Sequence, residues 1–218
     1  MPHAGGRWRR HLASAALLSL VWLAATPRVD ATTLRKMDLA ELVVQADRVV
    51  YVRTVGSSVY WDPTGTQIYT DTTFEVLTEA KGQGGPTVTV SMLGGRIDPL
   101  EMREDGTPAF TLGEEVVLFT LDRVDGRSDL VGFCQGVMRV QPELETGEKF
   151  AVAEVPLGVT LVGPGEPQQT TGRSSVLRAP LAALLEEVQQ IVAGSRPPGP
   201  VIATSPDTDL LEVEGGNP

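Results

Sequence analysis

The sequence predicts a mostly-β protein, built as a small barrel or a sandwich with a helix near each end of the domain. Apolar residues alternate with polar ones in runs about ten residues apart, which is typical of short strands. Gly, Pro and Asp cluster between these runs, where turns are expected. A long alternating run over 67–80 suits a strand that bends to close a barrel.

The first elements follow in order from Asp38. A short helix is expected over 38–45, with Asp38 as its N-cap and an apolar stripe formed by Leu39, Leu42, Val43 and Ala46. Residues 49–55 are β-branched and predict a strand, and Asp62-Pro63-Thr64-Gly65 predicts a turn. The strand over 67–80 places Ile68, Thr72, Phe74 and Val76 on one face.

The second half alternates strands with turns and ends in a helix. Strands are predicted over 87–92, 115–121, 129–134, 137–140 and 150–155, and the continuous apolar run at 115–121 indicates a strand buried on both faces. Asp125-Gly126 and Thr146-Gly147 predict tight turns. Residues 94–112 have no sustained period and indicate a long connection, and 163–175 indicate a flexible linker. A helix is expected over 180–193, with Gly194 at its C′ position.

The two ends of the chain are predicted to lie outside the domain. Residues 1–31 have the basic, apolar and small-residue regions of a signal peptide, with cleavage expected after Ala31 or, as an alternative, after Ala25. A membrane anchor is the other interpretation, but its apolar segment is shorter than a spanning helix needs. Residues 32–195 are then one β-barrel domain, and 196–218 form a disordered, acidic, Pro-rich tail.

Charge and histidine content restrict the function. The net charge of −10 disfavours binding to the phosphate backbone of nucleic acids and to anionic membranes. We therefore expect an exported, periplasmic or extracellular monomer with a protein partner, no nucleic acid and no membrane span after processing. His3 and His11 both lie in the predicted signal peptide, so histidine-dependent triads and most zinc sites are excluded from the mature chain. Cys134 lies in an apolar stretch and is interpreted as a buried inert thiol, with a reactive or intermolecular thiol as the alternative.

The order of several segments resembles a known group of proteins. These segments are Ala46-Asp47-Arg48-Val49-Val50, Phe74-Glu75-Val76-Leu77 before Lys81-Gly82, Gly113 to Phe119, and Leu130 to Cys134. Over about residues 45–140 the chain resembles uncharacterised exported bacterial β-rich proteins and, remotely, the netrin-like OB barrel of tissue inhibitors of metalloproteinases. The resemblance implies an OB-like (netrin/TIMP-like) barrel of five to seven strands and a protein-binding role, with an exported metalloprotease as one possible partner.

This resemblance has clear departures at the N-terminus. The inhibitors chelate the protease zinc through an N-terminal cysteine that disulfides hold in place. Here the mature chain would begin near Thr32, without a cysteine or a disulfide, and nothing in the sequence indicates what would hold this segment rigidly.

Other chemical motifs are weak, so no catalytic, cofactor-binding or metal-binding residue is assigned. Gly172-Arg173-Ser174 has only the end of a phosphate-loop pattern. A hairpin turn explains Asp122, Asp125 and Asp129 better than a calcium loop does. Paired carboxylates such as Glu101, Glu104 and Asp105 leave a histidine-free hydrolase open as an alternative.

The predicted function is that of a non-catalytic protein-binding module that uses loops at the barrel ends. Adjacent aromatic residues at a strand end cannot both face the core, and aromatic residues at loop tips are common binding anchors. Long loops on a rigid scaffold also concentrate binding residues. A structural envelope protein is a third hypothesis beside the hydrolase. The candidate partner-binding surface consists of Tyr60, Trp61, Arg96, Met102 and Phe110.

Overall fold

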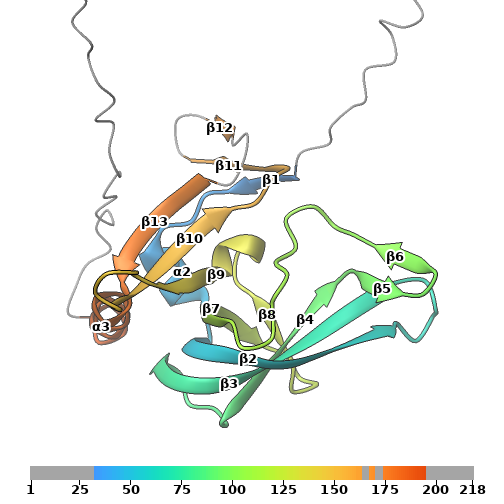
Figure 1. Ribbon diagram of the computed structural model, residues 1–218, viewed down its shortest axis with the longest axis horizontal. Helices are drawn as coiled ribbons and strands as arrows, with labels where there is room; N and C mark the ends of the chain where they lie inside the picture. Colours follow the sequence, from blue (N-terminus) through green and yellow to red (C-terminus); the bar gives the residue numbers. More distant parts are fainter. Residues whose placement is uncertain (1–31, 164–166, 170–173, 195–218) are drawn as a thin grey trace, which may run out of the picture. The chain divides into compact units, whose positions relative to one another are not determined.

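The computed structural model describes residues 32–163, 167–169 and 174–194 (Figure 1). The predicted signal peptide, the predicted tail and part of the predicted linker lie outside these residues. The helices are α2 (Leu39–Gln45) and α3 (Leu181–Val192). Among the described residues, no helix is long and apolar enough to span a membrane. The strands are β1 (Thr32–Arg35), β2 (Arg48–Trp61), β3 (Ile68–Lys81), β4 (Thr87–Leu93), β5 (Gly95–Ile97), β6 (Leu100–Met102), β7 (Glu115–Asp122), β8 (Ser128–Leu130), β9 (Val137–Pro142), β10 (Lys149–Val155), β11 (Val159–Val162), β12 (Pro167–Gln169) and β13 (Ser174–Pro180).

Five strands close into a barrel, as the sequence predicts. Strands β7, β2, β3 and β4 pair in that order and are antiparallel, β8 pairs with β4 in parallel, and β8 also pairs with β7, which closes the ring. This pairing order gives an OB-like barrel. Strands β2 and β3 are 14 residues each, and register shifts within their pairing mark the irregularities that let a long sheet bend.

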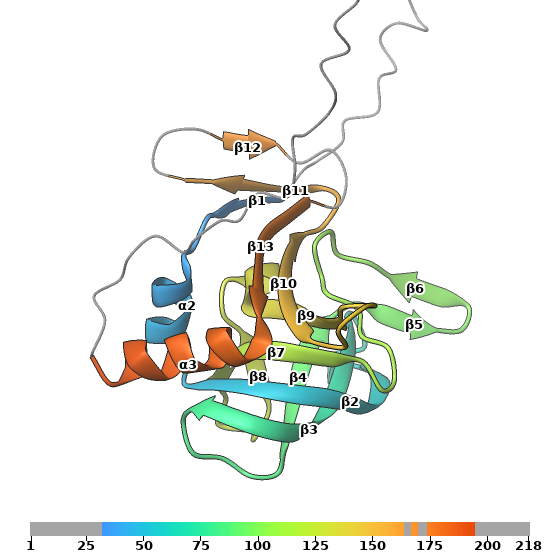
Figure 2. The same cartoon turned by 60° about the vertical axis from the view of Figure 1, so that its left-hand side comes forward.

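The barrel continues into a side sheet that supports the helices. Strand β9 pairs with the first half of β7, and β10 and β13 follow it outward in the same sheet. Helices α2 and α3 lie beside this extension, and both views show the small sheet β1–β11–β12 next to it (Figures 1 and 2). The β5–β6 hairpin lies away from the helices, beside the ends of β2, β3 and β4 (Figure 2).

Strand β7 separates two hydrophobic cores, which confirms the prediction of a central strand buried on both faces. Val116 and Leu118 point into the barrel interior, and Val117 and Phe119 point toward the helices. Strand β2 alternates in the same way, because side chains of a strand point to opposite faces in turn. The barrel core contains Val50, Val52, Phe74, Val88, Val90, Met92, Val116, Leu118 and Val137.

Both helices have the ends that the sequence indicates. Asp38 accepts a hydrogen bond from the Glu41 backbone N–H at 2.8 Å, and the Glu41 side chain accepts one from the Asp38 backbone, which completes a capping box. Gly194 has a φ of 67° directly after α3 and donates to the Ile191 carbonyl. At the other end of α2, the Lys81 amino group donates to the carbonyls of Val43 and Ala46, where cations stabilise a helix.

Five local predictions are wrong. The strand predicted over 49–55 continues to Trp61 in β2, because β3 pairs with it along that whole length. The connection 94–112 contains the β5–β6 hairpin, and the predicted strand 129–134 ends at Leu130, followed by a short 3₁₀ turn at Phe133–Gly136. The predicted linker 163–175 contains β12 and the start of β13. The N-terminal segment, for which no support was expected, forms β1 and pairs in parallel with β11, with the Thr32 N–H donating to the Gly158 carbonyl at 2.8 Å.

A charged network joins the barrel to the side sheet and makes stability depend on pH. Glu115 accepts hydrogen bonds from Lys149 at 2.7 Å, from the Tyr51 hydroxyl, and from Arg53 at 3.0 Å. Burial alone would raise the pKa of Glu115, but these three donors outweigh it and lower the pKa to about 2.

We expect acid to remove the stabilisation that Glu115 provides. Because its pKa is lower in the folded chain than in the unfolded one, the contribution is complete above about pH 5 and falls away toward pH 2. Its size is about 1–2 kcal/mol at a partly exposed site. Glu115→Gln should therefore lose less unfolding free energy than the wild type between pH 5 and pH 2. Glu75→Gln, at a more exposed carboxylate, is the matched control; equal losses in wild type and Glu115→Gln would contradict the assignment.

Candidate functional site

Two loops at one end of the barrel meet around a pocket that is rich in tyrosine and arginine. The loop between β2 and β3 supplies Asp62 and Pro63, and the hairpin between β7 and β8 supplies Arg123 and Arg127. The strands beneath supply Tyr60, Tyr69 and Ser91. The pocket has a volume of about 270 Å³. We call the group Tyr60, Tyr69, Asp71, Ser91, Arg123 and Arg127 the tyrosine–arginine face.

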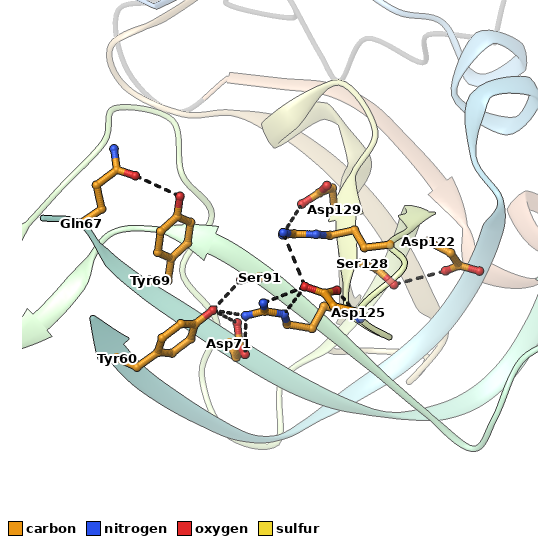
Figure 3. Close-up of polar contacts among 11 residues, drawn as sticks. Tyr60, Gln67, Tyr69, Asp71, Ser91, Asp122, Asp125, Ser128 and Asp129 are labelled. Carbon is orange, nitrogen blue, oxygen red and sulfur yellow. Dashed lines mark hydrogen bonds and ion pairs between the residues drawn. The ribbon is translucent and has the colours of Figure 1, made fainter. Parts of the chain in front are cut away.

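Tyr60 is fixed at the centre of this face. Its hydroxyl donates to Asp71 Oδ1 at 3.1 Å, lies 3.2 Å from Ser91 Oγ, and accepts a hydrogen bond from Arg127. The Tyr60 ring stacks beside Tyr69, with ring centres 6.1 Å apart and planes 21° apart. Figure 3 shows the two rings side by side and the polar contacts of Tyr60. The half-buried aromatic surface is therefore held in one orientation.

Both loops around the pocket are rigid because their carboxylates are fully engaged. Asp62 accepts hydrogen bonds from the Thr64 hydroxyl and from the backbone N–H groups of Gln67, Thr66 and Thr64, which lower its pKa to about 2. This ties the predicted turn into one shape. The loop conformation thus exists before any partner arrives.

The predicted hairpin at Asp125-Gly126 is confirmed, and arginines surround its carboxylates. Asp125 accepts a hydrogen bond from Arg127 at 2.7 Å, and Arg123 forms ion pairs with Asp125 and Asp129 (Figure 3). The pKa of Asp125 is lowered by Arg127, and that of Arg127 is raised by Asp125. Within the described residues, no group of three or more His, Cys, Asp or Glu side chains is placed to hold a metal ion.

Three of the predicted binding residues line a different hollow. Arg96, Met102 and Phe110 lie around a space of about 570 Å³ between the β5–β6 hairpin, the connection after it and the open end of the barrel. We call this space the barrel-mouth hollow. Arg96 is ion-paired with Asp98 at 2.8 Å, and Phe110 packs edge-on against Phe74 with ring centres 4.9 Å apart. Phe110 therefore closes the barrel core as much as it lines the hollow.

The two hollows lie on opposite faces of β3, so the structure separates the predicted surface into two parts. Tyr69 lines the pocket of the tyrosine–arginine face, whereas Thr70 and Thr72 line the barrel-mouth hollow, and successive strand residues point to opposite faces. Trp61 follows Tyr60 and pairs with Ile68, whose side chain lies against Gly95 of the hairpin. Trp61 is 36% exposed and does not line the pocket around Tyr60.

Of the tyrosine–arginine face, sequence reasoning proposed Tyr60 alone and missed Tyr69, Asp71, Ser91, Arg123 and Arg127. Tyr69 alternates with the barrel-facing residues of its strand, so its outward direction was readable, but its contact with Tyr60 depends on the pairing of β2 with β3. Arg127 lies 67 residues from Tyr60, and the two meet only because β8 closes the barrel beside β4. No local signal in the sequence indicates that contact.

Cys134 has the environment of an unreactive thiol. It is 4% exposed in the 3₁₀ turn, and burial raises its pKa to about 11. We expect the native thiol to react with a disulfide reagent at pH 8 roughly 100-fold more slowly than the unfolded chain, because thiolate and access are both lacking. The measurement is the rate at which the disulfide reagent releases its own thiol, with and without denaturant. A fast stoichiometric reaction of the folded protein would favour the alternative of a reactive thiol.

No protein-family model matches the chain, and no curated protein matches its sequence.

Proposed function

We propose that this protein is a non-catalytic binding module that holds a protein partner at its tyrosine–arginine face. One observation carries the proposal: two hydrogen-bonded loops meet beside an open pocket in which Tyr60 is fixed by Asp71, Ser91 and Arg127 and stacks beside Tyr69. Tyr and Arg are the residue types that most often dominate the energy of protein interfaces. A surface that is already ordered loses little entropy on binding.

Charge also supports a protein partner, and the fold supports the location of the site. The rim carries the charged side chains of Arg123, Arg127 and Asp62, so it presents charges of both signs to a protein surface. The net charge of −10 disfavours nucleic acid. In OB-like barrels the loops at these two positions are a common binding surface, a fold-level analogy that supports the location alone. Export of the chain and an exported metalloprotease as the partner belong to the same proposal and rest on the N-terminal sequence and on the family resemblance.

Affinity capture with two aromatic variants tests the proposal. The bait is the chain from Thr32, incubated with the exported-protein fraction of the source organism, and bound proteins are identified by mass spectrometry. We expect Tyr69→Ala to weaken capture of one dominant partner by roughly 30-fold, as loss of an interface hot spot does. Tyr69 is half-buried and outside both main cores, so the melting temperature of the Tyr69→Ala variant should stay close to that of the wild type.

Trp61→Ala is the matched control, because it removes a neighbouring aromatic ring from the opposite side of β2. This variant should capture the partner as well as the wild type does. Loss of capture with Trp61→Ala and retention with Tyr69→Ala would move the interface to the barrel-mouth side. Specific capture that neither variant changes would contradict the proposal, and self-association without capture would favour the structural envelope protein.

One observation supports a second candidate function, that of a hydrolase that uses carboxylates. Glu101, Glu104 and Asp105 all line the barrel-mouth hollow, which is a concave site of the kind that the hypothesis requires. Glu101 is ion-paired with Arg103 at 2.5 Å, which leaves Glu104 and Asp105 as the pair to test. A glycosidase activity that disappears in both Glu104→Gln and Asp105→Asn would establish this function instead.

A further inference from the structure

An apolar cavity lies between helix α2 and the side sheet, apart from both surfaces described above. It has a volume of about 330 Å³. Elements far apart in the sequence line it: α2, β9, β10, β11, β13 and the 3₁₀ turn. The lining side chains are mostly aliphatic or sulfur-containing: Met37, Leu39, Leu42, Cys134, Met138, Ala153, Val155, Leu161 and Leu177.

The cavity opens to solvent on one side, and its floor lies where two hydrophobic clusters meet. Leu42, Met138 and Leu161 line it, yet each is at most 4% exposed. Leu42 and Met138 belong to the cluster beneath the helices, and Leu161 belongs to a smaller cluster with Cys134, Val155 and Val159. Protein interiors are normally close-packed, so an apolar recess of this size that reaches buried side chains is a place that a ligand can fill. Its aliphatic floor offers water few hydrogen-bond partners.

We propose that this cavity binds a single unbranched alkyl chain with an uncharged head group. Its volume falls in the range of small-molecule sites, about 300–1,000 Å³. Among the described residues that line it there is no aromatic ring on which a planar ligand could stack. The flexible side chains of Met37 and Met138 can adapt to a slender chain, as methionines do at binding surfaces. This inference is independent of the partner-binding function proposed above.

The charges near the cavity select the head group. Lys36, Asp38, Gln135 and Glu154 are the polar residues that reach it, and Lys36 and Asp38 are exposed, which marks the side that faces solvent. One cation and two anions give this side no excess of positive charge, so a carboxylate head group is disfavoured. A hydroxyl, amide or ester can exchange hydrogen bonds with the same groups without a charge to desolvate.

Methionine methyl groups report directly on the proposed site. The chain has five methionines; Met37 and Met138 line this cavity, whereas Met92 and Met102 line the barrel-mouth hollow. The full chain, labelled with ¹³C at the methionine methyls, is titrated with 1-decanol in an NMR experiment. The expected result is a saturable shift of the Met37 and Met138 signals, with Met92 and Met102 unchanged. Shifts at Met92 and Met102, or no saturable shift, would overturn the assignment.

Two variants and two further probes complete the test. Ala153→Leu fills the cavity and should abolish the decanol-induced shifts, and Ala153→Val should weaken binding at least tenfold. Ala109→Leu adds the same atoms at an exposed position outside the cavity and should bind decanol as the wild type does. Decanoate should bind at least tenfold more weakly than decanol, and decylammonium should bind no more tightly than decanol. Undiminished binding to Ala153→Leu would overturn the site, and tighter binding of decanoate would overturn the head-group assignment.

Discussion

Replacing Arg48 with methionine should lower the free energy of unfolding by about 3–5 kcal/mol, because it breaks a buried ion pair from one side. The Arg48 side chain is 7% exposed and donates to Glu79 Oε1 at 2.8 Å. Without Arg48, the Glu79 carboxylate would be left partly buried without its cation. Urea denaturation at pH 7 measures the loss.

The loop after β3 explains why Arg48 matters more than its ion pair alone. Gly82 and Gly84 pass directly over its side chain, and a Cβ atom on Gly84 would overlap the Arg48 guanidinium group. Arg48 thus supports the loop that joins β3 to β4 as well as neutralising Glu79. Arg96→Met is the matched control, since the exposed Arg96–Asp98 pair should contribute less than about 1 kcal/mol. Equal losses of unfolding free energy for Arg48→Met and Arg96→Met would show that the buried ion pair of Arg48 contributes no more than an exposed one.

Replacing Phe74 with alanine should lower the free energy of unfolding by about 3–5 kcal/mol, as large-to-small changes in a well-packed core do. Phe74 is fully buried in the barrel core and contacts Phe110 edge-on. Phe110→Ala should be less destabilising because Phe110 is only half-buried where the connection closes the barrel. Thermal and urea denaturation of both variants show which substitution lowers the free energy of unfolding more. A larger loss for Phe110→Ala would place the centre of the core at the barrel mouth.

The elements that the sequence predicted well are those whose environment is local or uniform. The run at 115–121 is apolar throughout because β7 lies between two cores, and this pattern needs no knowledge of the topology. Helix α2 was predictable from Asp38 and the apolar stripe after it. The long strand β3 kept its alternation through Phe74, so its barrel-facing side was also identified.

The wrong predictions arise where the strands that pair are distant in the sequence. Residues 32–35 form a strand only because β11 lies beside them, about 125 residues further along the chain, so local propensity could not reveal β1. The hairpin in 94–112 consists of two three-residue strands, too short to show a period. For the candidate site, Tyr60 lies near the end of β2 and is half-buried, and its binding role stays a prediction. The separation of Tyr60 from Arg96, Met102 and Phe110 followed from the alternating faces of β3 and required the strand register.

Site-specific photo-crosslinking tests the central claim, which is that a protein partner binds at the tyrosine–arginine face. A photoreactive amino acid replaces Pro63, which lines the pocket beside Tyr60, and in a second protein replaces Leu144, a fully exposed loop residue between β9 and β10. Both proteins are irradiated in the exported-protein fraction. The account predicts one crosslinked partner from position 63, lost when Tyr69→Ala is added, and none from position 144. A crosslink from position 144 alone, or a crosslink from position 63 that Tyr69→Ala leaves unchanged, would contradict it.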